Sequence, residues 1–320
     1  MELGYTLSSE ETGPRQLVRY AARAEEVGFG FAMISDHFHP WIDQMGHSPF
    51  VWSVLGAVAE ATQRLRVGTA VTCPTMRTHP AVIAQAAATT ALLFEGRFLL
   101  GVGSGENLNE HVIGERWPTT AERQEMLREA VGVIRHLWEG GERDWSGKHY
   151  TVEDARIYDL PQPLPQILVA AAGPQSARLA AEVGDGLIGT DPDSELVTAF
   201  NEAGGRGRPV YGQLAVCWAE TEDRAREVAH QAWPLAGIPG PIRSELRRPK
   251  EFEALTDLVT PEQVAEKMPL GPDPARHAAA IEEFAKAGFT HVWVHQVGPD
   301  QEGFFRFYQH QVLPQLRRAA

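Results

Sequence analysis

The chain has 320 residues, 43% of them hydrophobic and 22% charged, which excludes a disordered chain and allows a large buried core. Its formal net charge of −13 argues against a nucleic-acid partner, because such binding depends on clustered Lys and Arg. Only Cys73 and Cys217 are present, and no apolar run approaches the roughly 20 residues that a membrane helix needs. We therefore expect a cytoplasmic protein with no disulfide framework, no membrane segment and no nucleic-acid ligand.

Eight short apolar runs rich in Val, Ile and aromatic residues predict strands. They lie at 2–8, 31–36, 64–72, 97–105, 166–173, 185–190, 209–219 and 291–298. Amphipathic stretches between them, such as 16–30 and 278–290, predict helices that end near glycine. Eight strand–helix units in this length predict a (β/α)8 TIM barrel, with a doubly wound open sheet as the alternative.

Two stretches interrupt this alternation. Residues 145–166 alternate like a small hairpin before a proline-rich linker, and residues 234–270 are rich in Pro, Arg and Glu. We expect both to be insertions in the loops of one domain that spans 1–320, and neither to be a separate domain.

Polar side chains follow several of the predicted strands, at the end where a barrel places its chemistry. Asp36 and His37 follow the second strand within the stretch SDHFHPW. Cys73 follows the third strand, and Glu106 with Asn109 follows the fourth. The convergence of these groups at one mouth predicts an acid/base site, although polar residues are also ordinary components of loops.

Other kinds of site fit this region less well. Its histidines supply ligand types for zinc or iron, but their spacing matches no metal motif. Ser104 lies in a glycine loop that differs from the nucleophile elbow of hydrolases. The glycine loops around residues 101–105 and 173 allow close backbone approach to a flat or phosphorylated ligand, and Trp41 could stack on a planar cofactor. Ordinary turns and a buried tryptophan explain these last features equally well.

Six motifs carry a resemblance to a known family. They are SDHFHPW, GHSPF, RVGTAVTCPTMRTHPAVIAQAAAT, GVGSGENLNEH, AAAGP and VGDGLIGT, in this order. The sequence resembles the luciferase-like flavin and deazaflavin oxidoreductases, and among them the branch of coenzyme F420-dependent glucose-6-phosphate dehydrogenases. The resemblance covers residues 3–318. It implies a TIM barrel, usually a homodimer, which holds coenzyme F420 in the barrel mouth and moves a hydride between the deazaflavin ring and an alcohol or hemiacetal.

The resemblance also implies roles for particular residues. His37 would take the hydroxyl proton of the substrate, Glu106 would deliver a proton to the ring, and Trp41 would position the reacting centre, with no metal required. Ala70 and Val71 correspond to a cis peptide bond that bulges behind the ring. The remaining implied cofactor contacts are Asp36, Cys73, Ser104, Gly105, Asn109, Ala172, Gly173, Gln175 and Ser176.

The sequence departs from the family pattern at the substrate and at the cofactor. Thr190, Arg243 and Lys267 match residues that hold a substrate phosphate, but Asp193 stands where a third base belongs. Cys73 and Ala172 replace a hydroxyl residue and a glycine, and a related branch uses ordinary flavin. The alternative function is therefore an FMN-dependent luciferase-like monooxygenase or reductase. A binding protein without turnover is disfavoured, because His37 and Glu106 are both present.

Overall fold

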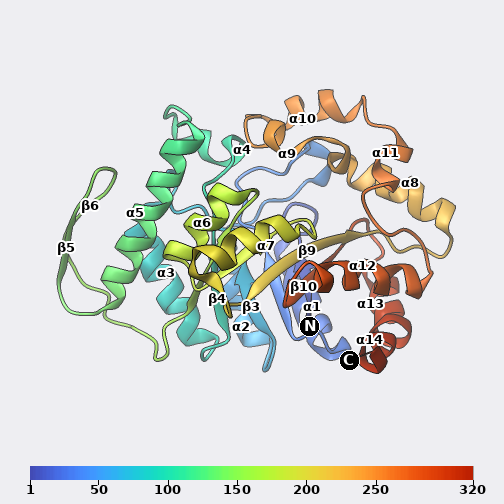
Figure 1. Cartoon of the computed structure of the whole chain (residues 1–320), viewed down its shortest axis with the longest axis horizontal. Helices are drawn as coiled ribbons and strands as arrows, with labels where there is room; N and C mark the ends of the chain where they lie inside the picture. Colours follow the sequence, from blue (N-terminus) through green and yellow to red (C-terminus); the bar gives the residue numbers. More distant parts are fainter. Residues whose placement is uncertain (320) are drawn as a thin grey trace.

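The computed structural model describes residues 1–319, and the side chains of residues 1–316. Eight parallel strands close into a barrel in the order β1, β10, β9, β8, β7, β4, β3, β2 (Figure 1). Their bounds are β1 (Glu2–Leu7), β2 (Phe31–Ile34), β3 (Arg66–Thr69), β4 (Phe98–Val102), β7 (Gln166–Ala170), β8 (Gly186–Gly189), β9 (Val210–Val216) and β10 (His291–Gln296). The predicted TIM barrel is confirmed, and the open sheet is wrong.

Helices surround this barrel and connect its strands. The longer ones and those near the C-terminus are α1 (Pro14–Val27), α2 (Val51–Ala61), α3 (Pro80–Leu93), α5 (Thr120–Trp138), α6 (Pro174–Val183), α7 (Ser194–Phe200), α8 (Glu222–Ala232), α12 (Pro274–Lys286), α13 (Gln301–Phe307) and α14 (Leu313–Ala319). Several begin with proline, whose missing N–H has no partner in a first turn anyway. Among the described helices, none is both long and apolar enough to cross a membrane.

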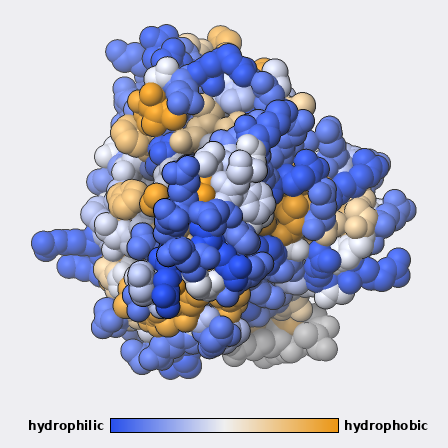
Figure 2. All heavy atoms as spheres, turned by 90° about the vertical axis from the view of Figure 1, so that its left-hand side faces the viewer, coloured by the Kyte–Doolittle hydropathy of each residue, from blue (hydrophilic) through white to orange (hydrophobic). Residues whose placement is uncertain are grey.

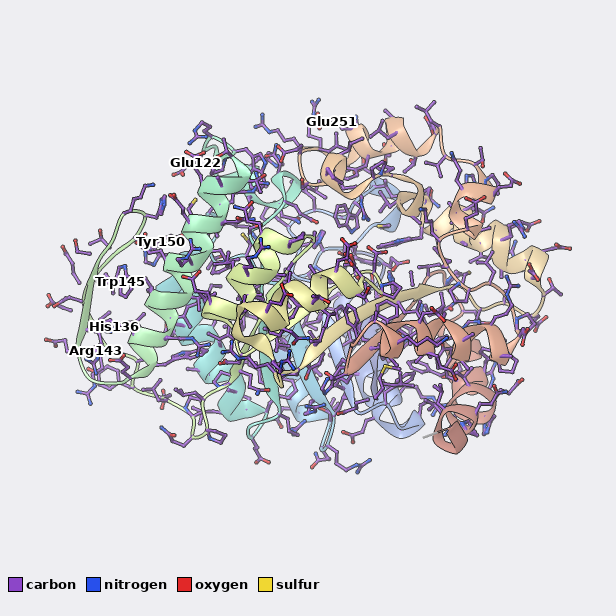
Figure 3. The ribbon with its side chains drawn as sticks, in the orientation of Figure 1. Glu122, His136, Arg143, Trp145, Tyr150 and Glu251 are labelled. Atoms are coloured by element: carbon purple, nitrogen blue, oxygen red, sulfur yellow. The ribbon has the colours of Figure 1, made fainter. Side chains whose placement is uncertain are left out.

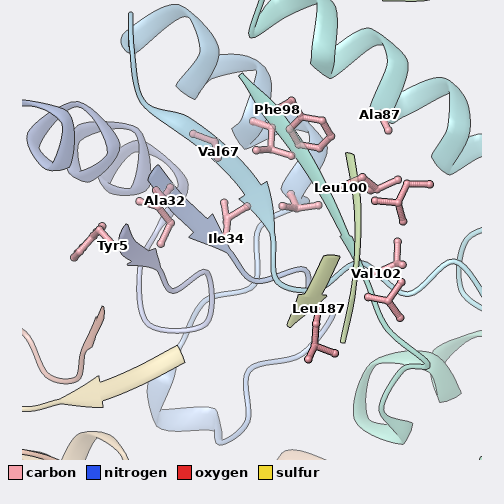
Figure 4. Close-up of a cluster of buried hydrophobic side chains, with 14 of the residues drawn as sticks. Tyr5, Ala32, Ile34, Val67, Ala87, Phe98, Leu100, Val102 and Leu187 are labelled. Atoms are coloured by element: carbon pink, nitrogen blue, oxygen red, sulfur yellow. The ribbon is translucent and has the colours of Figure 1, made fainter. Parts of the chain in front are cut away.

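Side chains alternate along each strand between the barrel interior and the surrounding helices. The interior cluster comprises Phe31, Met33, Leu99, Leu168, Ile188, Tyr211 and Trp293. The intervening residues, such as Ala32, Ile34, Leu100 and Val102, pack in the layer between barrel and helices (Figure 4). Buried on both faces, the strands appear in the sequence as nearly continuous apolar runs.

The first insertion is a two-stranded antiparallel hairpin between α5 and β7. It consists of β5 (Arg143–Ser146) and β6 (Thr151–Ala155), so it begins before the predicted residue 145 and ends well before 166. The hairpin runs alongside α5, and Trp145 faces His136 of that helix with ring centroids 5.8 Å apart (Figure 3). The Tyr150 hydroxyl donates to the Thr75 carbonyl at 2.9 Å. The hairpin is thereby tied to the loop after β3.

The second insertion forms short helices between α8 and α12. They are η4 (Pro234–Gly237), α9 (Gly240–Arg243), α10 (Pro249–Thr256) and α11 (Pro261–Ala265). The Asn107 N–H donates to the Ser244 carbonyl at 3.1 Å, which joins the insertion to α4 (Asn107–Glu110). Phe252 of α10 packs against Trp41 of the loop after β2. The insertion therefore covers loops at the C-terminal ends of β2 and β4, while the single-domain assignment stays a prediction.

Candidate active site

Three loops place an imidazole between two carboxylates at the mouth of the barrel. Glu10 follows β1, His37 follows β2 and Glu106 follows β4. The Nε2 atom of His37 lies 3.3 Å from Glu10 Oε1 and 3.7 Å from Glu106 Oε2. The His37 and Glu10 side chains are 11% and 4% exposed, whereas Glu106 is 34% exposed. The structure thus brings the predicted pair of His37 and Glu106 together and adds Glu10 to it.

The ring of His37 is fixed from two sides. Its Nδ1 atom lies 3.2 Å from the His39 carbonyl, which can only accept a hydrogen bond, so Nδ1 carries a proton. The centroid of Trp41 lies 4.9 Å from that of the imidazole, and Phe252 contacts Trp41 edge-on at 5.4 Å. Nε2 is therefore the nitrogen left to exchange protons.

Glu10 is held in its charged form. Burial alone raises its pKa, but the charge of His37 and the hydrogen bond donated by the Ser35 hydroxyl lower it more, so the pKa lies below its usual range. Ser35 donates to Glu10 Oε2, and the hydroxyls of Ser8 and Ser9 lie 3.3 and 3.4 Å from that oxygen. A buried carboxylate beside Nε2 stabilises the imidazolium that forms when His37 takes a proton.

Glu106 is shifted in the opposite direction. Desolvation raises its pKa, and the charges of His37 and Arg243 offset this only in part. The pKa values of the two acids that flank His37 are thus shifted in opposite directions. This arrangement makes Glu10 the charged stabiliser and Glu106 the proton donor. The chemistry that this geometry supports is proton transfer at Nε2 of His37, with Glu106 able to hold a second proton.

A second histidine–carboxylate pair lies beside the first. His295 of β10 places Nε2 2.7 Å from Glu11 Oε2, and Trp233 contacts its ring edge-on with centroids 4.5 Å apart. Glu10 and Glu11 are consecutive, and β1 is paired with β2 on one side and β10 on the other. The loop after β1 therefore supplies one carboxylate to each neighbouring strand.

The loop after β3 forms a bulge at the mouth. The peptide bond between Ala70 and Val71 is cis, as the resemblance implied. Gly103 of the adjacent loop makes room for this bulge, because a Cβ atom there would lie 2.6 Å from Val71 Cγ2. Gly105 has a φ of 85°, and a Cβ atom there would lie 2.6 Å from Cys73 Sγ. Val71, Cys73 and the predicted contact Gly105 thus lie close together.

Two other predicted cofactor contacts hold the His37 loop in place. Both carboxylate oxygens of Asp36 are bonded, one to the Thr72 hydroxyl at 2.8 Å and the other to Arg77 Nη2 at 2.9 Å. Asn109 Oδ1 accepts from the N–H groups of Phe38 and His39 at 2.9 and 3.3 Å. Asp36 and Asn109 therefore anchor the loop on either side of His37.

Glu110 lies beneath these loops and is almost completely buried. Its Oε2 accepts from the Arg77 backbone N–H at 2.8 Å, and its Oε1 lies 3.7 Å from Arg77 Nε. Burial raises the pKa of Glu110 to about 6, against the hydrogen bond and charge of Arg77.

Replacing Glu110 by Gln tests this shift through stability. Between its ordinary pKa of 4.5 and its folded pKa of about 6, Glu110 binds a proton more tightly in the folded state. The free energy of unfolding therefore falls by about 2 kcal/mol as the pH rises through this window, and the loss persists above it. Gln does not titrate, so the wild type alone should lose this stability. We therefore expect the free energy of unfolding of Glu110→Gln, relative to that of the wild type, to rise by up to that amount between pH 5 and 7.5 in denaturant titrations. Parallel stability curves for the two proteins would contradict this.

Four further predicted cofactor contacts lie at or just before the start of α6. Ala172 N donates to the Ser176 hydroxyl at 3.1 Å, and that hydroxyl donates to the Gly173 carbonyl at 3.0 Å. The helix has no side-chain cap, so the N–H groups of Gln175 and Ser176 remain available to an anion. A Cβ atom on Gly173 would meet no atom within 4 Å.

The predicted substrate residues lie on three separate segments. Thr190 follows β8, and its hydroxyl lies 3.3 Å from Asp191 Oδ2. Arg243 ends α9, and its charge acts on Glu106. Lys267 lies exposed after α11, which packs against α8 and η4. Asp193 caps α7, accepting from the N–H groups of Glu195 and Leu196 at 2.8 and 3.2 Å.

A metal site was the disfavoured alternative for this region. Within residues 1–316, no group of three or more His, Cys, Asp or Glu side chains is placed to hold a metal ion. The acidic and imidazole groups at the mouth are instead engaged with each other and with Ser, Thr and Arg.

Comparison with known proteins decides the family. The sequence matches the luciferase-like monooxygenase family over residues 1–291. The chain belongs to this family. It is 39% identical to an F420-dependent glucose-6-phosphate dehydrogenase of Kribbella flavida over 99% of both chains. It is 36% identical to the enzyme of that name from Microbacterium testaceum, covering 99% of this chain and 98% of the relative.

A solved structure supports the same assignment to the luciferase-like family. An F420-dependent secondary alcohol dehydrogenase, in complex with an F420–acetone adduct, matches with a TM-score of 0.92 and 30% identity over 99% of both chains. The predicted family is therefore confirmed on sequence and on structure.

Three residues of this luciferase-like site were not found in the sequence. Glu10 lies three residues beyond β1 in the run SSEE, so the polar residues at that strand end were a signal that could have found it. Arg77 and Glu110 lie inside the motifs that carry the resemblance, but nothing in their spacing indicates that they meet. Their contact depends on the loops after β3 and β4 folding together.

Proposed function

We propose that this chain is a coenzyme F420-dependent oxidoreductase that moves a hydride between an alcohol or hemiacetal carbon and the deazaflavin ring. The observation that carries the proposal is the imidazole of His37, held with Nε2 between Glu10 and Glu106. Full-length relatives named F420-dependent, and a 30% identical neighbour solved with an F420–acetone adduct, support F420 over FMN.

The residues at the mouth fit a flat ring with an anionic extension. Val71, Cys73 and Gly105 lie close together, and with Ala70 and Ser104 these small residues would allow the close backbone approach that a flat ring requires. The uncapped start of α6 would hold an anionic group through the N–H groups of Gln175 and Ser176, beside Ala172 and Gly173. Asp36 and Asn109 would contribute by placing the loops that border this surface.

The chain's own residues supply the proton chemistry. When bound, coenzyme F420 provides the ring that accepts or returns the hydride. His37 Nε2 takes the hydroxyl proton of the substrate, and Glu10 stabilises the imidazolium that results. Glu106, whose pKa is raised, holds the proton destined for the ring. Because its Oε2 lies 3.7 Å from Nε2, Glu106 is also placed to recover a proton from His37 for the next turnover.

Cofactor titration tests this function against the FMN alternative. We expect F420 to bind with micromolar or better affinity, measured by its fluorescence, and the bound cofactor to be reduced when an alcohol substrate is added. A chelator should leave this activity intact. Tight binding of FMN with none of F420 would overturn the proposal, as would activity lost with chelator and restored by zinc or iron.

The substrate side is shaped by Asp193. Its carboxylate is engaged as the cap of α7, so it remains at the strand end where the family resemblance implies a positive charge. A dianionic phosphate held by Thr190, Arg243 and Lys267 would face this carboxylate. At an effective dielectric of about 20 and a separation of roughly 7 Å, the repulsion is on the order of 2 kcal/mol per charge before screening. We infer that a hexose 6-phosphate is a poor substrate and that an alcohol without a phosphate is favoured.

Asp193→Lys is the variant that tests the phosphate position. Removing one repulsion and adding one attraction should lower KM for hexose 6-phosphate by at least roughly tenfold, which corresponds to about 1.4 kcal/mol. Asp193→Ser is the matched control, because Ser keeps a helix cap without the charge. Steady-state kinetics with phosphorylated and unphosphorylated alcohols measure both. No phosphate-dependent gain in Asp193→Lys would contradict a phosphate site at this strand end.

A homodimer in the cytoplasm, with no nucleic-acid or membrane partner, completes the proposal. Val82, Leu92 and Leu93 of α3 are 54%, 43% and 45% exposed, which gives this helix an apolar face suited to a partner subunit. On the side that bears the hairpin, Figure 2 shows small apolar groups among polar side chains. Light scattering of the protein as it elutes from a size-exclusion column should give the mass of two chains.

A further inference from the structure

One buried arginine connects three of the loops at the mouth. Arg77 lies after β3, and its side chain is 12% exposed. Its Nη2 reaches the loop after β2, where it donates to Asp36 Oδ1 at 2.9 Å and to the Asp36 carbonyl at 3.3 Å. Its backbone N–H reaches α4, after β4, where it donates to Glu110 Oε2 at 2.8 Å. These loops carry His37, the Ala70–Val71 bulge and Glu106.

Arg77 faces more negative charge than it carries positive charge. Two nearly buried carboxylates, Asp36 and Glu110, share one guanidinium. Asp36 is satisfied by Arg77 and the Thr72 hydroxyl together. Within the described part of the chain, Glu110 Oε1 and Arg77 Nε make no hydrogen bond, although they lie 3.7 Å apart. The guanidinium is therefore committed to Asp36, and Glu110 holds mainly the backbone of Arg77.

This commitment bears directly on the acid/base group. Asp36 immediately precedes His37, and Asn109, which holds the next two N–H groups of that loop, immediately precedes Glu110. Movement of Arg77 would thus loosen the His37 loop at both of its anchors. We propose that Arg77 is the positioning residue of this active site: by holding Asp36 and Glu110 it fixes His37 between Glu10 and Glu106. The inference rests on the proposed function for its kinetic consequences only.

Arg77→Lys and Asp36→Asn test the proposal. A lysine keeps the positive charge but lacks the rigid planar guanidinium that orients Nη2 toward the Asp36 carboxylate and carbonyl. Each substitution should lower kcat for alcohol oxidation at least tenfold while KM changes less than threefold. Because both act through one contact, the double variant should be no worse than the poorer single variant. Arg128→Lys is the matched control, because Arg128 forms a bidentate ion pair with Glu182 on the surface.

A second readout needs neither cofactor nor turnover. The ring of His37 lies 4.9 Å from Trp41, so the NMR resonance of its Cε1–H group is sensitive to its position through the Trp41 ring current. Assigned by its loss in His37→Asn, this resonance should move in Arg77→Lys and Asp36→Asn and stay in place in Arg128→Lys.

The two readouts separate the outcomes. A folded Arg77→Lys protein with unchanged kcat and an unchanged His37 resonance would overturn the proposal, as would single effects that simply add in the double variant. If Arg77→Lys does not fold, Thr72→Val removes the other bond to Asp36 and should move the resonance in the same direction as Asp36→Asn does. An unmoved resonance there counts against the proposal. If the chain proves inactive with F420, a moved resonance still supports the positioning role.

Discussion

Replacing His37 by Asn should lower kcat for alcohol oxidation by at least roughly a hundredfold while leaving Kd for F420 within a few fold. The base is needed only as the hydroxyl proton leaves, and positioned general bases typically contribute about 10²–10⁴-fold. Asn retains an amide N–H that can reach the His39 carbonyl, so the loop keeps that contact. Because binding precedes proton transfer, the loss should appear in kcat and not in cofactor affinity.

His39→Asn is the control for this experiment. It removes an imidazole from the same loop, but that ring contacts the Leu108 carbonyl and stacks on His111. We expect a change of less than about threefold there, and a slower turnover in Glu106→Gln. Retention of most of kcat in His37→Asn, with normal F420 binding by fluorescence titration, would show that another group is the base.

Gly101→Ala should be the most damaging substitution for stability. Gly101 lies in β4, and a Cβ atom there would lie 1.9 Å from the Thr69 carbonyl oxygen of the neighbouring strand. Backbone cannot rotate away as a flexible side chain can, so β3 and β4 would have to separate. We expect a loss of about 3 kcal/mol or more in the free energy of unfolding. Thermal denaturation should show a fall of roughly 5–10 °C.

Gly173→Ala provides the comparison. Its backbone is extended, with a φ of −177°, and an added Cβ atom would lie in open space. Its melting temperature should therefore match that of the wild type. If Gly101→Ala and Gly173→Ala have the same melting temperature, the close approach of β4 to the Thr69 carbonyl does not exist in solution.

The barrel could be predicted because its strands are buried on both faces. Each appears as an apolar run of a few residues, and the glycines and prolines at helix ends mark the alternation. Strand ends were less visible. The run 64–72 continues past Thr69 without a change in character, yet β3 ends there because the chain turns into the Ala70–Val71 bulge. The hairpin was recognised by its alternation, but its first strand begins at Arg143, within a charged stretch.

The candidate site was predictable only where chemistry lies at a strand end within a recognised motif. His37, Glu106 and Trp41 meet that condition, and the structure brings them together. Glu10 approaches His37 from another strand, so their contact depends on the pairing of β1 with β2, which no local pattern records. Asp36 stays a predicted cofactor contact, but its bond to Arg77 joins residues that are 41 positions apart, and no local pattern indicates it. Long-range pairs of this kind require the folded chain.

The paired carboxylates of the loop after β1 have a consequence for how the enzyme is made. Ribosomes synthesise a chain from its N-terminus, so Glu10 and His37 emerge well before β10. β1, however, is fixed between β2 and β10, and β10 is the last strand synthesised, at His291–Gln296. His295, the partner of Glu11, arrives with it. A nascent chain thus gains its acid/base centre only after β10 has been made, and a truncation that removes β10 should yield a protein without catalytic activity.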